Sequence, residues 1–157
     1  MDVSRSLPYE TLPEMDETFA AQLTRGRGLD DLELTARLTS RYATQAIESQ
    51  VKAFFEPAAG RWACYLQDAL LAYFLRVDEP YGLKAFSQCQ ASRQTGCWRT
   101  LFTTVGQQIW TPGLEKLAVE ALSSTNADVA SDAAAALKPR GWSAKTNLVE
   151  QARSESK

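Results

Sequence analysis

Residues that favour turns divide the sequence at nearly regular intervals. Gly28, Gly60, Gly96 and Asn126 stand at intervals of 32, 36 and 30 residues, each just before a stretch with apolar residues at i, i+3 and i+4. Glycine and asparagine tolerate the left-handed backbone conformation that tight turns use. No stretch sustains the alternation of apolar and polar residues that is typical of a strand. We therefore expect an all-α chain built from repeated units.

Capping residues mark several of the expected helix starts. Thr111 stands directly before Pro112, and Asp78 stands before Glu79 and Pro80, so a side-chain cap is followed by proline near the first helical position. Asn126 with Asp128 starts a later helix, which Pro139 and Gly141 end. The predicted helices lie near residues 15–24, 30–41, 44–55, 61–76, 79–91, 97–109, 112–123 and 127–137, with a further one near 144–153.

Taken in pairs, the predicted helices form about four helical hairpins. A period of about 30 to 40 residues with two helices per unit is typical of an alpha-solenoid. We expect a right-handed alpha-alpha superhelix over residues 15–142. It is preceded by a poorly ordered acidic segment, 1–14, and followed by a tail, 143–157, with a short helix.

The last hairpin carries a resemblance to a known family. In LEKLAVEALSSTNADVASDAAAALKPRG, residues 114–141, a first helix ends in Glu-Ala-Leu and a short polar turn leads to Asp128, Val129 and a run of alanines ending in Leu137. This pattern resembles a HEAT repeat, an armadillo-like helical hairpin, and the upstream hairpins are similar in helix length with aromatics in place of aliphatics. The resemblance implies a HEAT-like alpha-solenoid. In place of the arginine that usually follows Asp-Val in the family, this chain has Ala130.

Composition and charge exclude several classes of protein. Apolar residues make up 45% of the chain and charged residues 23%, close to the average for a soluble domain. The longest strongly apolar run, 69–75, is too short to cross a bilayer and predicts a buried helix. The net charge of -2 gives no overall field that attracts nucleic acid or an anionic membrane. With no apolar core for a secretory signal near the N-terminus, we expect a cytoplasmic protein without a membrane partner.

Neither the cysteines nor the acidic residues predict a catalytic or metal site. Cys64, Cys89 and Cys97 are odd in number and have no CxxC spacing, so we expect buried, inert thiols rather than a disulfide framework. The chain has no histidine, which removes Ser-His-Asp and Cys-His catalysis and histidine-bound metals. Asp30 and Asp31 stand at a helix start and fit helix capping. We expect no metal, no cofactor and no enzymatic activity.

Polar residues on the second helix of each predicted hairpin predict a binding surface. Along the very apolar helix near 61–76, Asp68 lies on one narrow edge at helical spacing, where a solenoid helix faces the concave side. The second helices of the neighbouring hairpins carry polar residues at the same spacing. We call this predicted surface the concave face, and its members are Arg37, Arg41, Arg61, Tyr65, Asp68, Arg76, Arg99, Thr103 and Gln107.

Tryptophans lie close to the concave face. Trp62 and Trp98 each follow a glycine by two residues near the start of a second helix. Packing between hairpins is one interpretation, because the ring can be buried while its N–H finds a loop carbonyl. The other is a role as hot-spot aromatics at a binding edge. Trp110 and Trp142 stand at helix ends, where they cover the edge of a hairpin.

These features favour a non-enzymatic protein-protein interaction module, a scaffold, adaptor or subunit of a larger assembly that binds a protein or peptide on its concave face. The family's alkylpurine glycosylase branch implies an alternative, a nucleic-acid-binding protein. Its arginines would then form a basic track, which Glu33 and Asp68 interrupt. A phycobilin-lyase-like protein is a third interpretation, although nothing in the sequence predicts a tetrapyrrole cavity.

Overall fold

A computed structural model describes residues 10–25, 28–56, 64–93 and 95–141, and these residues are helical with no strand among them. The all-α prediction is therefore confirmed. The expected helix near 144–153 lies outside the described residues, as do Gly60, Arg61, Trp62 and Trp142. In chain order the elements are η1 (Pro13–Met15), α2 (Asp16–Arg25), α3 (Leu29–Tyr42), η2 (Gln45–Ile47), α4 (Glu48–Phe55), α5 (Cys64–Val77), α6 (Glu79–Ala91), η4 (Gly96–Arg99), α7 (Leu101–Gln108), α8 (Pro112–Ala121), α9 (Ala127–Leu137) and η5 (Lys138–Arg140).

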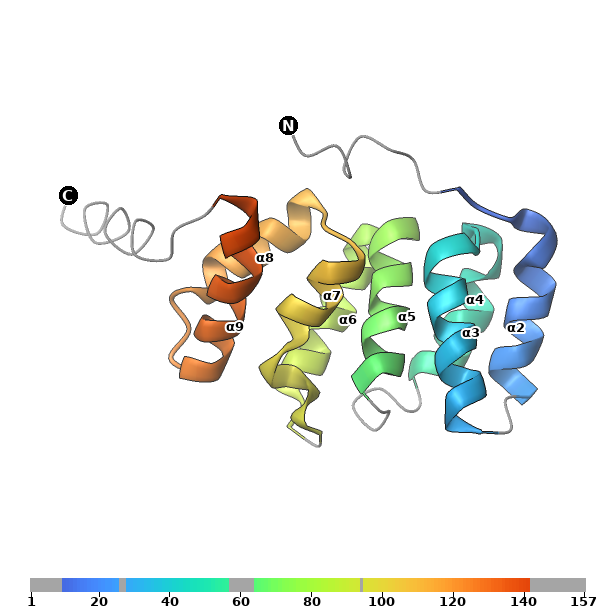
Figure 1. Ribbon diagram of the computed structural model, residues 1–157, viewed down its shortest axis with the longest axis horizontal. Helices are drawn as coiled ribbons and strands as arrows, with labels where there is room; N and C mark the ends of the chain where they lie inside the picture. The colour runs from blue at the N-terminus through green and yellow to red at the C-terminus, as the bar shows by residue number, and fades with distance from the viewer. Residues whose placement is uncertain (1–9, 26–27, 57–63, 94, 142–157) are drawn as a thin grey trace.

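The helices are arranged in two layers (Figure 1). In one layer α3, α5, α7 and α9 pack against each other in chain order, and in the other α2 contacts α4 and α6 contacts α8. Helices of the same hairpin also contact each other, as α2 does with α3 and α8 with α9. No helix of the described residues is long and apolar enough to cross a membrane.

Three predicted capping residues take the roles expected for them. The Thr111 hydroxyl accepts a hydrogen bond from the backbone N–H of the third residue of α8 at 3.1 Å, and Asp78 accepts one from the third residue of α6 at 3.3 Å. Asn126 accepts from two backbone N–H groups of α9, at 3.0 and 3.4 Å. Gly141 follows η5 with a φ of 83°, the left-handed conformation in which glycine is favoured.

One predicted helix is wrong in detail, and Gly28 does not use the left-handed conformation that glycine tolerates. Gly28 has a φ of -160°, which is extended backbone, and among the described residues Gly141 alone has a positive φ. The expected helix near 97–109 is interrupted at Thr100, which lies between the 3-10 turn η4 and helix α7 with a ψ of 17°. Gly28, Gly96 and Asn126 therefore precede helical segments as expected, and none of the three adopts a left-handed conformation.

Helix α5 is the most enclosed element, as its apolar run predicts. All residues from Leu66 to Leu75 are buried, and α5 contacts α3, α4, α6 and α7. Gly82 lets α6 approach closely, since a Cβ at this position would lie 2.6 Å from the backbone nitrogen of Leu75. The polar side chains of α5 are therefore surrounded by neighbouring helices on most sides.

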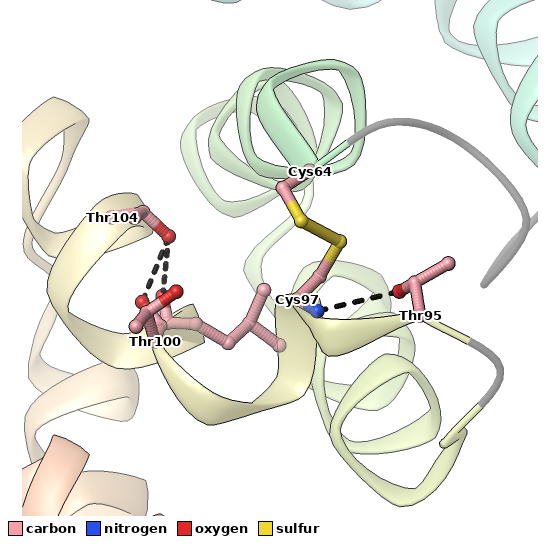
Figure 2. Close-up of a disulfide and its surroundings, with 6 residues drawn as sticks. Cys64, Thr95, Cys97, Thr100 and Thr104 are labelled. Atoms are coloured by element: carbon pink, nitrogen blue, oxygen red, sulfur yellow. Dashed lines mark hydrogen bonds between the residues drawn. A yellow bond between two sulfur atoms is a disulfide. The ribbon is translucent and has the colours of Figure 1, made fainter.

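The prediction of three inert thiols is wrong for two of them. Cys64, at the start of α5, forms a disulfide with Cys97 of η4, with their Cα atoms 5.1 Å apart (Figure 2). Cys89 is free and buried, and burial raises the pKa of its thiol to about 12. The cysteine spacing could not reveal the pair because the two residues come together only when the second and third hairpins stack.

Reduction of the disulfide is expected to lower the free energy of unfolding by about 3 to 4 kcal/mol. The crosslink joins residues 33 apart in sequence, and closing a loop of this length removes conformational entropy from the unfolded chain. Urea unfolding with and without dithiothreitol measures the difference. A Cys64→Ala/Cys97→Ala variant serves as the control and should be insensitive to the reductant. Equal unfolding midpoints for the wild type under both conditions would contradict the crosslink.

Candidate binding pocket

A pocket of about 510 Å³ lies where three successive helices of one layer meet. Volumes of this size are common for sites that hold small molecules or side chains of a partner. Helix α3 supplies Arg37, Ser40 and Arg41, α5 supplies Tyr65, Asp68 and Ala72, and α7 with the residue after it supplies Thr104, Gln107, Gln108 and Ile109.

The pocket unites five members of the predicted concave face and leaves the others out. Those in the pocket are Arg37, Arg41, Tyr65, Asp68 and Gln107. Arg76, Arg99 and Thr103 do not line it, and Arg61 lies outside the described residues.

Asp68 is the most deeply buried ionisable group of the pocket. Its exposed fraction is 4%, and its Oδ1 has no hydrogen-bond partner among the described residues. Burial raises the pKa of this carboxyl to about 7, an effect that the Thr104 hydroxyl opposes and the nearby Asp132 strengthens. The pocket therefore contains a carboxyl group that changes charge near neutral pH and forms no ion pair with the described residues.

The two arginines of α3 carry the positive charge at the pocket. Arg37 is exposed and forms an ion pair with Glu33, one helical turn earlier, at 2.7 Å. Arg41 is also exposed, its guanidinium lies 5.8 Å from the ring centroid of Tyr42, and it forms no ion pair with the described residues. Arg41 thus leaves its charge available to a ligand.

Arg76 stabilises the fold and is not part of the pocket. Its Nε donates to the carbonyl of Ser40 at 2.9 Å, and its Nη2 donates to those of Thr39 and Ala43 at 3.2 and 2.6 Å. These carbonyls belong to the last turn of α3 and to Ala43, the residue that follows it, where a helix leaves acceptors short of intrahelical partners. The Thr39 carbonyl also accepts from the backbone N–H of Ala43. The expectation that Arg76 belongs to the same polar edge as Asp68 is wrong for this reason.

Thr103 is likewise used within the fold. Asp132 of α9 accepts hydrogen bonds from the backbone N–H groups of Phe102 and Thr103, at 2.7 and 3.1 Å, and from the Thr103 hydroxyl at 2.6 Å. Asp132 therefore caps the start of α7 from the next hairpin, and burial raises the pKa of its carboxyl. The sequence pattern marked Asp132 neither as a cap nor as a contact between hairpins.

Trp98 and Arg99 contact one another away from the pocket. The exposed fraction of Trp98 is 8%, and the guanidinium groups of Arg93 and Arg99 each lie 5.3 Å from its ring centroid. Arg99 also forms a long ion pair with Asp128, at 3.8 Å. Little of the Trp98 ring is accessible to a partner, which favours packing over a hot-spot role. Trp110 is covered by Arg140, whose guanidinium lies 3.7 Å from the ring centroid.

The sequence pattern missed two pocket residues of α7, Thr104 and Gln108, for an identifiable reason. On α7 it predicted Thr103 and Gln107 by counting in steps of four from Arg99, as in one continuous helix. The 3-10 turn η4 and the break at Thr100 shift the phase of the helix. Counting from Arg99 therefore selected Thr103, which binds Asp132, whereas Thr104, three residues before Gln107, and Gln108 line the pocket.

The pocket offers hydrogen bonding and charge rather than a recognisable catalytic or metal arrangement. It contains a buried carboxyl, exposed guanidinium groups, two amides and hydroxyl groups. The described residues include no cluster of three or more His, Cys, Asp or Glu side chains placed to hold a metal ion. Such a set of donors and acceptors is suited to recognising a polar or charged ligand.

Replacing Arg76 by Ala is expected to lower the free energy of unfolding by about 2 to 4 kcal/mol. The variant loses charged hydrogen bonds to three carbonyls at the end of α3. Arg41→Ala is the matched control, because this exposed arginine contributes within about 0.5 kcal/mol. Urea unfolding of both variants measures the difference, and equal stabilities would assign the two arginines the same role.

Replacing Asp68 by Asn is expected to remove a pH dependence of stability between about pH 4 and 7. The folded chain raises the pKa of Asp68 from 3.8 to about 7. In this range the folded state keeps a proton that the unfolded state releases, so stability falls as pH rises and stays low above pH 7. A shift of about three units corresponds to roughly 4 kcal/mol. Asp68→Asn should therefore match the wild type near pH 4 and exceed its stability by up to this amount near pH 8.

Urea unfolding at several pH values measures this difference, which includes the electrostatic coupling between Asp68 and Asp132. Gln50→Ala, at an exposed position of α4, changes no ionisable group and is the control, so its difference from the wild type should be constant with pH. If the difference between Asp68→Asn and the wild type is also constant, burial does not raise the pKa of Asp68.

Comparisons of the chain with protein-family models, curated proteins and solved structures found no match. The HEAT resemblance accordingly stays a prediction, and the pocket is the structural feature that bears on function.

Proposed function

We propose that this protein is a non-enzymatic binding module that holds a peptide segment of a partner protein on the layer formed by α3, α5 and α7. In this proposal the two layers of helices form a HEAT-like, right-handed alpha-alpha superhelix. The module serves as a scaffold, an adaptor or a subunit of a larger assembly.

The pocket between α3, α5 and α7 carries this proposal. Several of its polar side chains are not needed to cap helices or pair with neighbours. Gln107 and Arg41 are exposed and make no hydrogen bond or ion pair with the described residues, and the Oδ1 of Asp68 also lacks a partner. Polar groups without a role in the fold, gathered around one pocket, are typical of a surface that recognises a ligand.

The contacts of the arginines weaken the nucleic-acid alternative. Binding to a phosphate backbone requires several basic side chains that are free to pair with phosphates. Arg76 is used at the end of α3, and Arg99 lies against Trp98 and pairs with Asp128. Arg37 is paired with Glu33, so among the described arginines of the predicted track Arg41 remains, a weak basis for binding nucleic acid.

The disulfide bears on the cellular compartment in which the protein resides. The sequence predicts a cytoplasmic protein, whereas the disulfide between Cys64 and Cys97 favours an oxidising compartment, since reducing compartments keep thiols free. Peptide binding on the pocket is compatible with either location.

Selection of a random displayed peptide library on the immobilised protein tests the proposal. We expect enriched peptides that bind in calorimetry, and an Arg41→Ala/Gln107→Ala variant should bind them at least about tenfold more weakly, a loss of roughly 1.4 kcal/mol. Both substituted side chains are exposed at the pocket, so the variant should fold as the wild type does.

Lys84→Ala, at an exposed position of α6 in the other layer, is the control and should bind as the wild type does. Two results would overturn the proposal: no enriched peptide, or enriched peptides that bind the pocket variant with unchanged affinity. Salt-dependent binding of DNA by the same preparation, lost in Arg41→Ala, would favour the nucleic-acid alternative instead.

A further inference from the structure

We infer that the pocket receives a basic side chain, lysine or arginine, of the bound peptide, whose cationic group donates hydrogen bonds to the carboxylate of Asp68. This inference rests on the proposed function and specifies which residue the module recognises.

The state of Asp68 is the first argument. A buried carboxylate without a partner is costly, and a cation is the group that best compensates its charge and fills its acceptor positions. Asp68 is 4% exposed, lines the pocket, and has no cation among its described neighbours to pair with Oδ1. A ligand with an ammonium or guanidinium group would supply a positive charge and hydrogen-bond donors to the Asp68 carboxylate.

The walls of the pocket are the second argument. Tyr65, Ala72 and Ile109 place an aromatic ring and aliphatic groups around the same space as Asp68. Lysine and arginine have long aliphatic stems that pack on apolar surface while the charged end binds a polar group. The volume of about 510 Å³ is ample for such a side chain.

The balance of charge is the third argument. Arg37 and Arg41 lie at exposed positions of α3, where solvent and salt screen their repulsion of a cation, and Glu33 further offsets the charge of Arg37. Asp68 is buried, so its attraction is screened much less. Arg41 can in turn pair with an acidic residue of the same peptide.

The ionisable groups around Asp68 are Arg37 and Arg41 on α3, Tyr65 on α5, Cys89 on α6 and Asp132 on α9. Helix α7 contributes only neutral side chains to the pocket.

Parallel selections of one random peptide library on the wild type and on Asp68→Asn test the inference. We expect lysine or arginine to be enriched at one position with the wild type, and this preference to be lost with Asp68→Asn. The variant exchanges a carboxyl for an amide of similar shape, and the removal of a buried ionisable group is expected to stabilise the fold. A circular-dichroism melt establishes that it is folded before selection.

Small probes isolate the cationic group. Nα-acetyl-lysine methylamide and Nα-acetyl-norleucine methylamide share the aliphatic stem, and only the first carries an ammonium group at its end. In NMR titrations at pH 8 we expect the lysine probe to bind the wild type at least tenfold more tightly than the norleucine probe, and Asp68→Asn to bind both alike. Because the pKa of Asp68 is about 7 in the free protein, affinity for the lysine probe should fall by up to tenfold per pH unit below pH 7.

The outcomes separate this inference from the proposed function. Equal affinity for both probes, or a basic preference that persists in folded Asp68→Asn, overturns the inference. Peptides enriched without a basic residue also overturn it but leave the module's peptide binding intact. Failure to enrich any peptide removes both proposals.

Discussion

The burial of α5 is the constraint on which the rest of the molecule depends. Leu66 to Leu75 have almost no exposed surface, and packing of this one helix holds α3, α4, α6 and α7 in place. Three of its contacts are of different kinds. Gly82 allows close backbone approach by α6, Arg76 binds the end of α3, and the disulfide at Cys64 ties α5 to η4. The pocket is formed where α3 and α7 flank the one edge of α5 that they do not fully cover.

Buried and half-buried polar side chains elsewhere in the molecule connect one hairpin to the next by binding helix ends. Asp16 accepts hydrogen bonds from the backbone N–H and hydroxyl of Thr44, and Asp132 binds the start of α7 in the same way. Arg140 donates to the carbonyls of Ala136 and Gly106, at 2.7 Å each. Each of these groups compensates backbone groups that a helix leaves unpaired. Asp68 differs because its Oδ1 is left without such a partner. Gln67 is also unpaired and buried, but it does not line the pocket.

Much of the fold followed from local patterns, and part of the pocket did too. Apolar spacing and capping residues placed the ends of α6 and α9, because a helix start depends on neighbouring residues alone. The same spacing put Asp68 and Tyr65 on one edge of α5, and both lie in the pocket. Arg76 was assigned to this edge as well, but its long side chain reaches the end of α3, which spacing along α5 cannot show. Thr104 was missed because counting in steps of four from Arg99 selected Thr103 instead.

The sequence by itself determined that the chain is helical, where most of its helices begin, and that one central helix is buried. These properties depend on residues a few positions apart. Only the tertiary structure decided that Cys64 and Cys97 pair, that Asp132 caps a helix of the preceding hairpin, and that Asp68 is left with an unpaired oxygen in a pocket. Each of those outcomes depends on how two hairpins stack, which brings together residues about 30 or more positions apart, and no local pattern encodes that distance.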